Sequence, residues 1–316
     1  MGRILYISHD IAEPRGGIGV IYDHVATLRA HGFEAYIVHG AKGFRYPFGP
    51  AEVPILDASV RLLDTDTVVV PEDHMPAIHG FRNVTCKKIL FCQNHYFFFN
   101  GLNRGEAWAD FGFSDYLCVS EPIQQAMLKW FGVTANIIRP FIDANYFSGK
   151  HQAPSPVITV ACMPRKGADH LRLVAGLVAT RKLAKTPPFA WAVIDNLPRD
   201  QVAMRLRESH IYLSTSVREG LGLPPLEAMA AGCLVVGFTG NGGLDYATDS
   251  NGIWVQDEDS WALADSLLAT IVGLGDPDTS PMLEAKRLAG QKTASAYNRS
   301  RFEHDLVAYW TARSRD

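Results

Sequence analysis

The stretch "SVREGLGLPPLEAMAAGCLVVGFTGNGG", residues 216–243, carries the clearest information about the fold. The Pro-Pro pair at 224–225 is incompatible with a helix running through it but suits a first helical turn. It therefore predicts a helix over 225–231, ended by Gly232. An unbroken apolar run follows, as in a strand covered on both faces. Loop, helix and buried strand in this order indicate an α/β layer structure.

The same stretch holds two glutamates on either side of the prolines. Glu219 falls in the glycine-containing loop, and Glu227 falls in the first turn of the predicted helix. Unpaired N–H groups and a positive dipole at a helix start favour phosphate oxygens. Carboxylates accept hydrogen bonds from hydroxyl groups. A ligand with a sugar on one side of a diphosphate and a ribose on the other would match all three elements.

The first half of the chain alternates strand and helix patterns. Short apolar runs rich in β-branched and aromatic residues occur at 3–8, 34–38, 67–71, 88–93, 115–120 and 136–140. They are too continuous for half-exposed strands, so we expect a parallel sheet covered on both faces. Between the first two runs, apolar residues keep a helical spacing at Ile18, Ile21, Val25 and Leu28, which predicts a βαβ unit.

The second half repeats the alternation. Strand patterns occur at 157–163, 189–195, 211–215 and 252–256, with helices over 169–184 and 199–209 and a mostly helical pattern from 260 onward. The proline-rich segment 139–157 predicts a domain boundary near residue 150. We therefore expect two Rossmann-like, doubly wound domains, 1–150 and 151–290, whose parallel sheets face a central cleft where ligands bind.

Composition limits the classes of partner. The chain has 316 residues, of which 20% are charged, and a net charge of −3, so neither nucleic acid nor an anionic surface is expected as its main partner. The five cysteines are widely spaced in apolar runs and predict reduced core residues. No signal peptide or apolar span is evident, which indicates a cytoplasmic protein. The basic residues between 286 and 301 leave peripheral contact with the inner membrane face as an alternative to a solvated surface.

The opening stretch also resembles a known family. "EGLGLPPLE" (219–227) is similar to the E-x7-E signature of retaining glycosyltransferases of the GT-B fold, specifically glycosyltransferase family 4, also called glycosyl transferases group 1. "AMAAGCLVVGFTGNGG" (228–243) resembles the helix, strand and glycine loop that follow it there. "RGGIG" (15–19) and "MPRKG" (163–167) are further matching pieces. The resemblance covers most of the chain, although 316 residues is short for this family.

The resemblance implies residue roles. Glu219 would contact the donor sugar, Glu227 the ribose hydroxyls, and Lys166 the donor diphosphate. Arg165 would replace the family's usual Gly-Arg, and His95 would be the cleft histidine that reaches the donor sugar. Segments that approach the donor would include Gly16 and Gly17 in the first domain, and Gly222, Leu223, Pro224, Gly242 and Gly243 in the second. Asp245 stands near the place of a family glutamate.

The resemblance further implies a retaining, metal-independent transferase with no cofactor, using a nucleotide-diphosphate sugar as donor. The departing diphosphate would accept the proton of the acceptor, which would be a glycan, lipid-linked or small-molecule hydroxyl. Polysaccharide or lipid-linked glycan biosynthesis is the usual setting of the family. The final segment, 291–316, would form a helix that packs back onto the first domain.

Two other classes stay open at this point. The departures at the Gly-Arg position and at Asp245 fit a non-catalytic subunit that binds a nucleotide sugar. A nicotinamide-dependent dehydrogenase would share the Rossmann-like alternation. However, "RGGIG" is not followed by an acidic residue at a strand end about 20 positions on, since Glu34 begins its strand.

Overall fold

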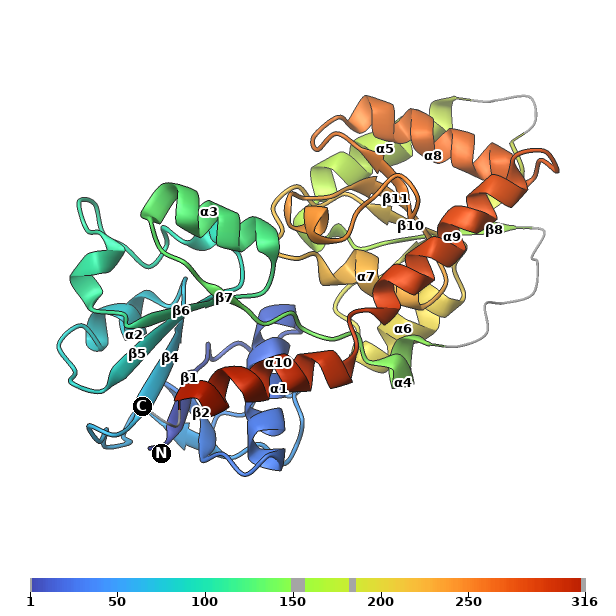
Figure 1. The fold of residues 1–316 in the computed structure, drawn as a ribbon. Helices are drawn as coiled ribbons and strands as arrows, with labels where there is room; N and C mark the ends of the chain where they lie inside the picture. Colours follow the sequence, from blue (N-terminus) through green and yellow to red (C-terminus); the bar gives the residue numbers. More distant parts are fainter. Residues whose placement is uncertain (1, 149–156, 182–185, 314–316) are drawn as a thin grey trace. The chain divides into compact units, whose positions relative to one another are not determined.

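The structure, a computed structural model, describes residues 2–148, 157–181 and 186–313. It divides into two compact units (Figure 1). Unit 1 comprises Met1–Pro140 and Ser300–Asp316, and unit 2 comprises Phe141–Arg299. The predicted boundary near 150 lies outside the described residues, and the division instead follows Pro140. The segment that returns to unit 1 starts at Ser300 rather than at 291.

Unit 1 contains a parallel sheet of seven strands in the order β3-β2-β1-β4-β5-β6-β7. The strands are β1 (Ile4–Ile7), β2 (Ala35–His39), β3 (Ile55–Asp57), β4 (Thr67–Pro71), β5 (Lys87–Cys92), β6 (Asp115–Cys118) and β7 (Asn136–Ile137). Successive strands add on one side of β1 up to β3 and then on its other side from β4. The switch point of this sheet therefore lies between β1 and β4.

The core of unit 1 confirms the expected pattern. The central strands carry buried apolar residues such as Leu5, Val68 and Leu90, as a sheet covered on both faces requires. The helices of this unit are α1 (Gly16–Ala30), α2 (Met75–Gly80), α3 (Glu121–Phe131) and all but the first residue of α10 (Arg299–Arg313). The four spaced residues predicted to face the core from α1 are all buried: Ile18, Ile21, Val25 and Leu28. Strand β3 was not predicted.

Unit 2 has a second parallel sheet, of five strands in the order β12-β11-β10-β8-β9. The strands are β8 (Ile158–Cys162), β9 (Phe189–Val193), β10 (Ile211–Ser214), β11 (Leu234–Phe238) and β12 (Ile253–Val255). The order reverses between β8 and β10, which is the switch point of this sheet. The helices are α4 (Ala144–Phe147), α5 (Ala168–Thr180), α6 (Arg199–Arg207), α7 (Leu223–Ala230), α8 (Ser260–Leu274) and α9 (Ser280–Ser295). The two sheets together confirm the predicted fold class.

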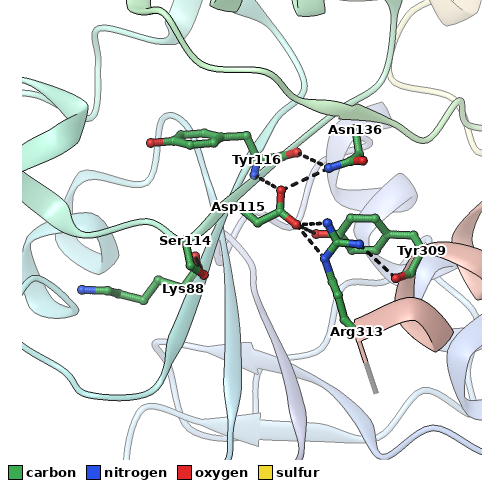
Figure 2. Close-up of polar contacts among 7 residues, drawn as sticks. All are labelled: Lys88, Ser114, Asp115, Tyr116, Asn136, Tyr309 and Arg313. Carbon is green, nitrogen blue, oxygen red and sulfur yellow. Dashed lines mark hydrogen bonds and ion pairs between the residues drawn. The ribbon is translucent and has the colours of Figure 1, made fainter. Parts of the chain in front are cut away.

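Helix α10 completes unit 1 from a distant part of the sequence. Trp310 is 1% exposed and donates its indole N–H to the Tyr6 hydroxyl at 3.3 Å. Arg313 and Tyr309 converge on Asp115 at the start of β6, with the Tyr309 hydroxyl 2.9 Å from the carboxylate (Figure 2). A buried aromatic residue and an ion pair therefore hold α10 to the sheet.

Two composition-based expectations can be compared with the structure. The five cysteines are buried and reduced, as predicted. Among the described residues, no helix combines the length and the apolar composition needed to cross a membrane.

Candidate active site

The prolines of the opening stretch lie inside α7, which begins two residues before the predicted start at 225. Gly222 is left-handed, with φ of +83°, and turns the chain into the helix before Pro224. Pro224 and Pro225 occupy the second and third helical positions, where an N–H would have no intrahelical acceptor. Glu227 is consequently in the second turn, and the prediction that it lies in the first turn is wrong.

The start of α7 offers two backbone N–H groups, those of Gly222 and Leu223. Neither donates a hydrogen bond to another described residue, whereas Pro224 and Pro225 carry no N–H. The Gly222 carbonyl accepts a hydrogen bond from the Tyr246 hydroxyl at 2.8 Å, which fixes the left-handed residue in place. The predicted helix start is therefore present but offers fewer N–H donors than an ordinary helix, and anion binding there stays a prediction.

Glu219 and Lys166 meet at the switch point of the unit 2 sheet. Lys166 ends the 3-10 turn Pro164–Lys166 after β8, and Glu219 lies in the loop after β10. Lys166 Nζ is 2.7 Å from Glu219 Oε2, and Ser216 donates to Glu219 Oε1 at 2.7 Å. The two side chains are 33% and 14% exposed, so both remain reachable by a ligand. The structure thus joins two residues that the sequence separates by 53 positions.

A strained turn supports the backbone of Glu219. The Gly242 N–H donates to the Gly240 carbonyl at 2.8 Å, and Asn241 between them has φ of +65° and ψ of −52°. This is a γ-turn with a central residue at positive φ, a rare and strained conformation. The Glu219 N–H donates to the same Gly240 carbonyl at 2.9 Å. The position of Glu219 is therefore coupled to this turn.

Asp257 holds the turn from the next strand end. It follows β12 and accepts three backbone N–H groups, from Thr239 and Gly240 at Oδ1 and from Asn241 at Oδ2, at 3.0, 3.1 and 3.0 Å. A carboxylate that accepts several backbone N–H groups is a strong local clamp. Asp257 was not among the predicted site residues, although a polar residue directly after an apolar strand was a signal for it.

Gly242 and Gly243 pack and cap this turn. A Cβ added to Gly242 would lie 2.5 Å from the carbonyl carbon of Gly220 and 2.6 Å from the carbonyl oxygen of Glu219, so only glycine fits there. The N–H groups of Gly242 and Gly243 are used inside the turn, donating to the carbonyls of Gly240 and Thr239. In this structure the backbone of the two glycines thus packs closely against the loop that carries Glu219.

Glu227 has an unusual environment for a carboxylate. It is half-buried and accepts no hydrogen bond from any other residue in the described ranges. Burial raises its pKa, although the charge of Arg199 acts in the opposite direction. The pKa of Tyr212, on β10, is raised by burial and further by the charges of both Glu219 and Glu227. The two carboxylates thus lie near one phenol, and Glu227 has free capacity to accept hydroxyl groups.

The other two predicted residues of unit 2 lie at the same sheet edge. Arg165 is exposed in the same 3-10 turn as Lys166, so the turn presents two cations in succession. Asp245 ends the 3-10 turn Gly242–Asp245, and its carboxylate accepts a hydrogen bond from the Tyr297 hydroxyl at 2.6 Å.

In unit 1, His95 follows β5 as the first residue of the 3-10 turn His95–Phe97. Burial lowers its pKa, and its Nδ1 is buried without a hydrogen-bond partner among the described residues. Glu72, at the end of the adjacent β4, is 3% exposed and accepts the Asn94 N–H at 2.7 Å. Glu72 therefore fixes the loop that carries His95.

Gly16 and Gly17 start α1 and do not form a separate loop. Arg15 at the N-cap makes no side-chain cap, and the first turn has no acidic residue. Gln93 donates to the Gly17 carbonyl at 3.1 Å and so connects the loop after β5 to this helix start. The Arg15 N–H at this helix start donates to the Tyr46 hydroxyl at 2.7 Å, and the donor contact that the family resemblance implies for Gly16 and Gly17 stays a prediction.

The described residues contain no group of three or more His, Cys, Asp and Glu side chains placed to hold a metal ion. Two carboxylates two positions apart are able to bind a divalent cation, but those of the Asp-x-Asp sequence at 257–259, in the second unit, are both engaged in other contacts. Asp257 clamps the γ-turn, and Asp259 caps α8 by accepting the Ala262 N–H at 2.9 Å.

The two parallel-sheet α/β domains match the structures of GT-B glycosyltransferases, which defines the fold class of this chain. Residues 191–271 match the family Glycosyl transferases group 1, and this matched segment of unit 2 contains Glu219, Glu227 and Asp257. A curated relative is the alpha-1,6-glucosyltransferase of Actinobacillus pleuropneumoniae serotype 7 (strain AP76). It is 27% identical over 280 residues, which cover 85% of this chain and 83% of that protein.

Solved structures with the same fold extend over nearly the whole chain. A glycosyltransferase from Rickettsia africae ESF-5 has a TM-score of 0.73 at 13% identity, covering 98% of both chains. Anabaena HepE, solved in complex with UDP and glucose, has a TM-score of 0.72 at 12% identity, covering 98% of this chain and 100% of that chain. At these identities the likeness concerns the fold.

Proposed function

We propose that this protein is a retaining glucosyltransferase that moves glucose from UDP-glucose to a hydroxyl group of a glycan. The observation that carries the proposal is the Lys166–Glu219 pair at the switch point of the unit 2 sheet, of which Glu219 lies inside the matched glycosyl transferases group 1 segment. The name of the Actinobacillus relative supports glucose as the sugar, and the UDP and glucose bound to HepE support the donor.

Each residue of the site has a chemical task in this proposal. Lys166, with Arg165 beside it, neutralises the diphosphate, on which charge develops as the glycosidic bond breaks. Glu219 accepts hydrogen bonds from glucose hydroxyls, and Glu227, which accepts none from the described residues, takes the ribose hydroxyls. The pairing of Lys166 with Glu219 before the donor arrives keeps both side chains in position at little entropic cost.

We propose retention of configuration because the relative is named for an alpha product and UDP-glucose itself carries glucose in the α configuration. The bond between glucose and diphosphate breaks, the acceptor oxygen bonds to the same face of the sugar, and the departing diphosphate takes the acceptor proton. No carboxylate nucleophile and no metal ion are part of this scheme.

The test combines turnover with stability. Purified protein is incubated with UDP-glucose, and UDP release is followed with and without a panel of glucosides. We expect Glu219→Ala and Lys166→Ala each to lower turnover at least about 100-fold while the melting temperature changes by no more than a few degrees. The matched control is Arg172→Ala, which removes an exposed ion pair with Asp169 on α5 of the same unit.

Near-normal turnover of either site variant would refute the assignment. NMR of the product decides the stereochemistry, and a β-linked product would refute retention. Tight UDP binding without turnover, under any acceptor, would instead support a non-catalytic binding subunit.

A further inference from the structure

The switch point of the unit 1 sheet holds a hydrogen-bonded histidine–aspartate pair. His9 follows β1 and Asp73 follows β4, the two strands between which the strand order reverses. His9 Nε2 is 2.8 Å from Asp73 Oδ1, and the side chains are 27% and 35% exposed. Ligands of open α/β sheets bind outside the carboxyl ends of the strands at such a point. The pair is thus reachable and lies where this kind of sheet binds ligands.

The geometry of the pair leaves one ring nitrogen for a ligand. A carboxylate can only accept, so the 2.8 Å contact places a proton on His9 Nε2. Nδ1 makes no hydrogen bond to any other residue in the described part of the chain. In the neutral ring Nδ1 accepts, and in the charged ring it donates. A hydroxyl group is able to serve as partner in both states, because it both donates and accepts.

The charges around the pair favour an uncharged ligand. Burial alone would raise the pKa of Asp73, but the hydrogen bond and charge of His9 hold it below its usual value, so Asp73 stays negative. Glu72 beside it is buried, and His74 stacks on His9 at 4.5 Å with its pKa lowered by burial. Asp10, also after β1, adds a second carboxylate, which pairs with His39. An anion would meet the negative charges of Asp73 and Asp10, whereas a sugar would not be repelled.

We propose that the His9–Asp73 pair is a binding site for an uncharged sugar, in which His9 Nδ1 hydrogen-bonds a hydroxyl group and Asp73 holds the imidazole in orientation. The inference rests on the proposed function, since it assigns this sugar as the acceptor. His9 is then a specificity-determining residue for the acceptor, and Asp73 is the residue that positions it.

The test measures sugar binding directly and by kinetics. On the full chain, the imidazole resonances of His9 are followed by NMR during titration with methyl α-D-glucopyranoside and, separately, with inorganic phosphate. We expect the glucoside and not phosphate to shift them. In transfer from UDP-glucose to the same glucoside, His9→Ala and Asp73→Asn should raise the half-saturating glucoside concentration about tenfold.

The matched control is His79→Ala, because His79 pairs with Glu106 in the same unit with exposures of 27% and 17% but lies at the end of α2, away from the strand ends. It should leave the glucoside dependence at the wild-type value. Shifts with phosphate alone, or equal glucoside dependence in all variants, would overturn the proposal. If wild-type protein neither transfers nor hydrolyses, the proposed function fails. The NMR titration still decides whether His9 binds a sugar.

Discussion

The two sheets of this protein each place a hydrogen-bonded pair of polar side chains at the same topological position but hold it by different means. In unit 2 the Lys166–Glu219 pair is supported by a γ-turn, by backbone N–H groups and by glycines that allow close approach. In unit 1 the His9–Asp73 pair is surrounded by titratable side chains, among them Glu72 and His74.

The difference shows two ways to prepare a sheet edge for a ligand. A site held by backbone has a fixed shape and a charge that changes little near neutral pH. A site held by histidines and carboxylates depends on which of its members carry protons. The first suits a ligand with a constant double negative charge, and the second suits hydroxyl groups.

Gly242→Ala should give the largest effect, because the added Cβ would lie 2.5 Å from the Gly220 backbone, which cannot move independently of Glu219. The two loops would have to separate, and displacement of the Glu219 loop by about 1 Å should cost about 100-fold in turnover. Turnover with UDP-glucose measures this loss, and thermal melting should fall by several degrees at the same time.

Gly17→Ala is the matched change at the unit 1 edge and sharpens the comparison. There the new Cβ would meet the Gln93 side-chain oxygen at 3.3 Å, and a side chain is able to shift. Alanine also favours the helix that contains this position. Its melting temperature should stay within a degree or two of wild type, and a loss as large as that of Gly242→Ala would break the distinction between the two edges.

Asp257→Ala should have the next largest effect on turnover after Gly242→Ala. It leaves three backbone N–H groups without their acceptor, so the turn at Asn241 relaxes and Glu219 loses its backbone support. We expect turnover to fall between about 10-fold and about 100-fold. Hydrogen exchange at Glu219 and at residues 239–241 should accelerate.

The control for Asp257→Ala is Asp259→Ala, which removes the cap of α8 two positions away. It should cost about 1 kcal/mol of stability without changing exchange at Glu219. Unchanged turnover in Asp257→Ala would show that the γ-turn keeps its conformation without the Asp257 carboxylate.

Glu72→Gln should have the smallest effect, visible in the pH dependence of stability. Burial, with the charge of Asp73, raises the pKa of Glu72 to about 8. Between pH 7 and 8 the unfolded chain has lost this proton and the native protein still holds it, so stability falls as pH rises. The slope should be at most about 1.4 kcal/mol per pH unit, and it should end near pH 8.

The amide introduced by Glu72→Gln cannot ionise but keeps an oxygen for the Asn94 N–H, so the variant should lack this slope in chemical denaturation. Burial lowers the pKa of His74 and of His95 below the ordinary histidine value, so these two side chains contribute little to the slope of stability between pH 7 and 8. Parallel curves for wild type and variant between pH 7 and 8 would mean that Glu72 is not protonated in the native state.

Most of the fold was readable from the sequence because fully buried parallel strands leave unbroken apolar runs. Strand β3 was missed because Ile55–Asp57 directly follows Pro54 and contains only two apolar residues, so no apolar run marks it. The start of α7 was misplaced because the left-handed conformation of Gly222 depends on contacts such as its bond to Tyr246.

The candidate site was readable where residues lie close in sequence, as in the stretch from Glu219 to Gly243. Pairs formed by different strand ends were not, because they depend on strand order, which the sequence does not state. His9 with Asp73, and Asp257 with the turn at Asn241, are of this kind. Each follows an apolar strand closely, so polar residues at strand ends were the available signal.

The return of α10 to unit 1 has a consequence for biosynthesis. Residues 1–140 leave the ribosome long before Trp310 and Phe302 exist, and these two side chains cover Tyr6 and His24. Unit 2 is continuous in sequence and has no such delay. Unit 2 is therefore able to fold as soon as its own residues have left the ribosome, whereas unit 1 stays incomplete, and accessible to chaperones and proteases, until α10 has also left it.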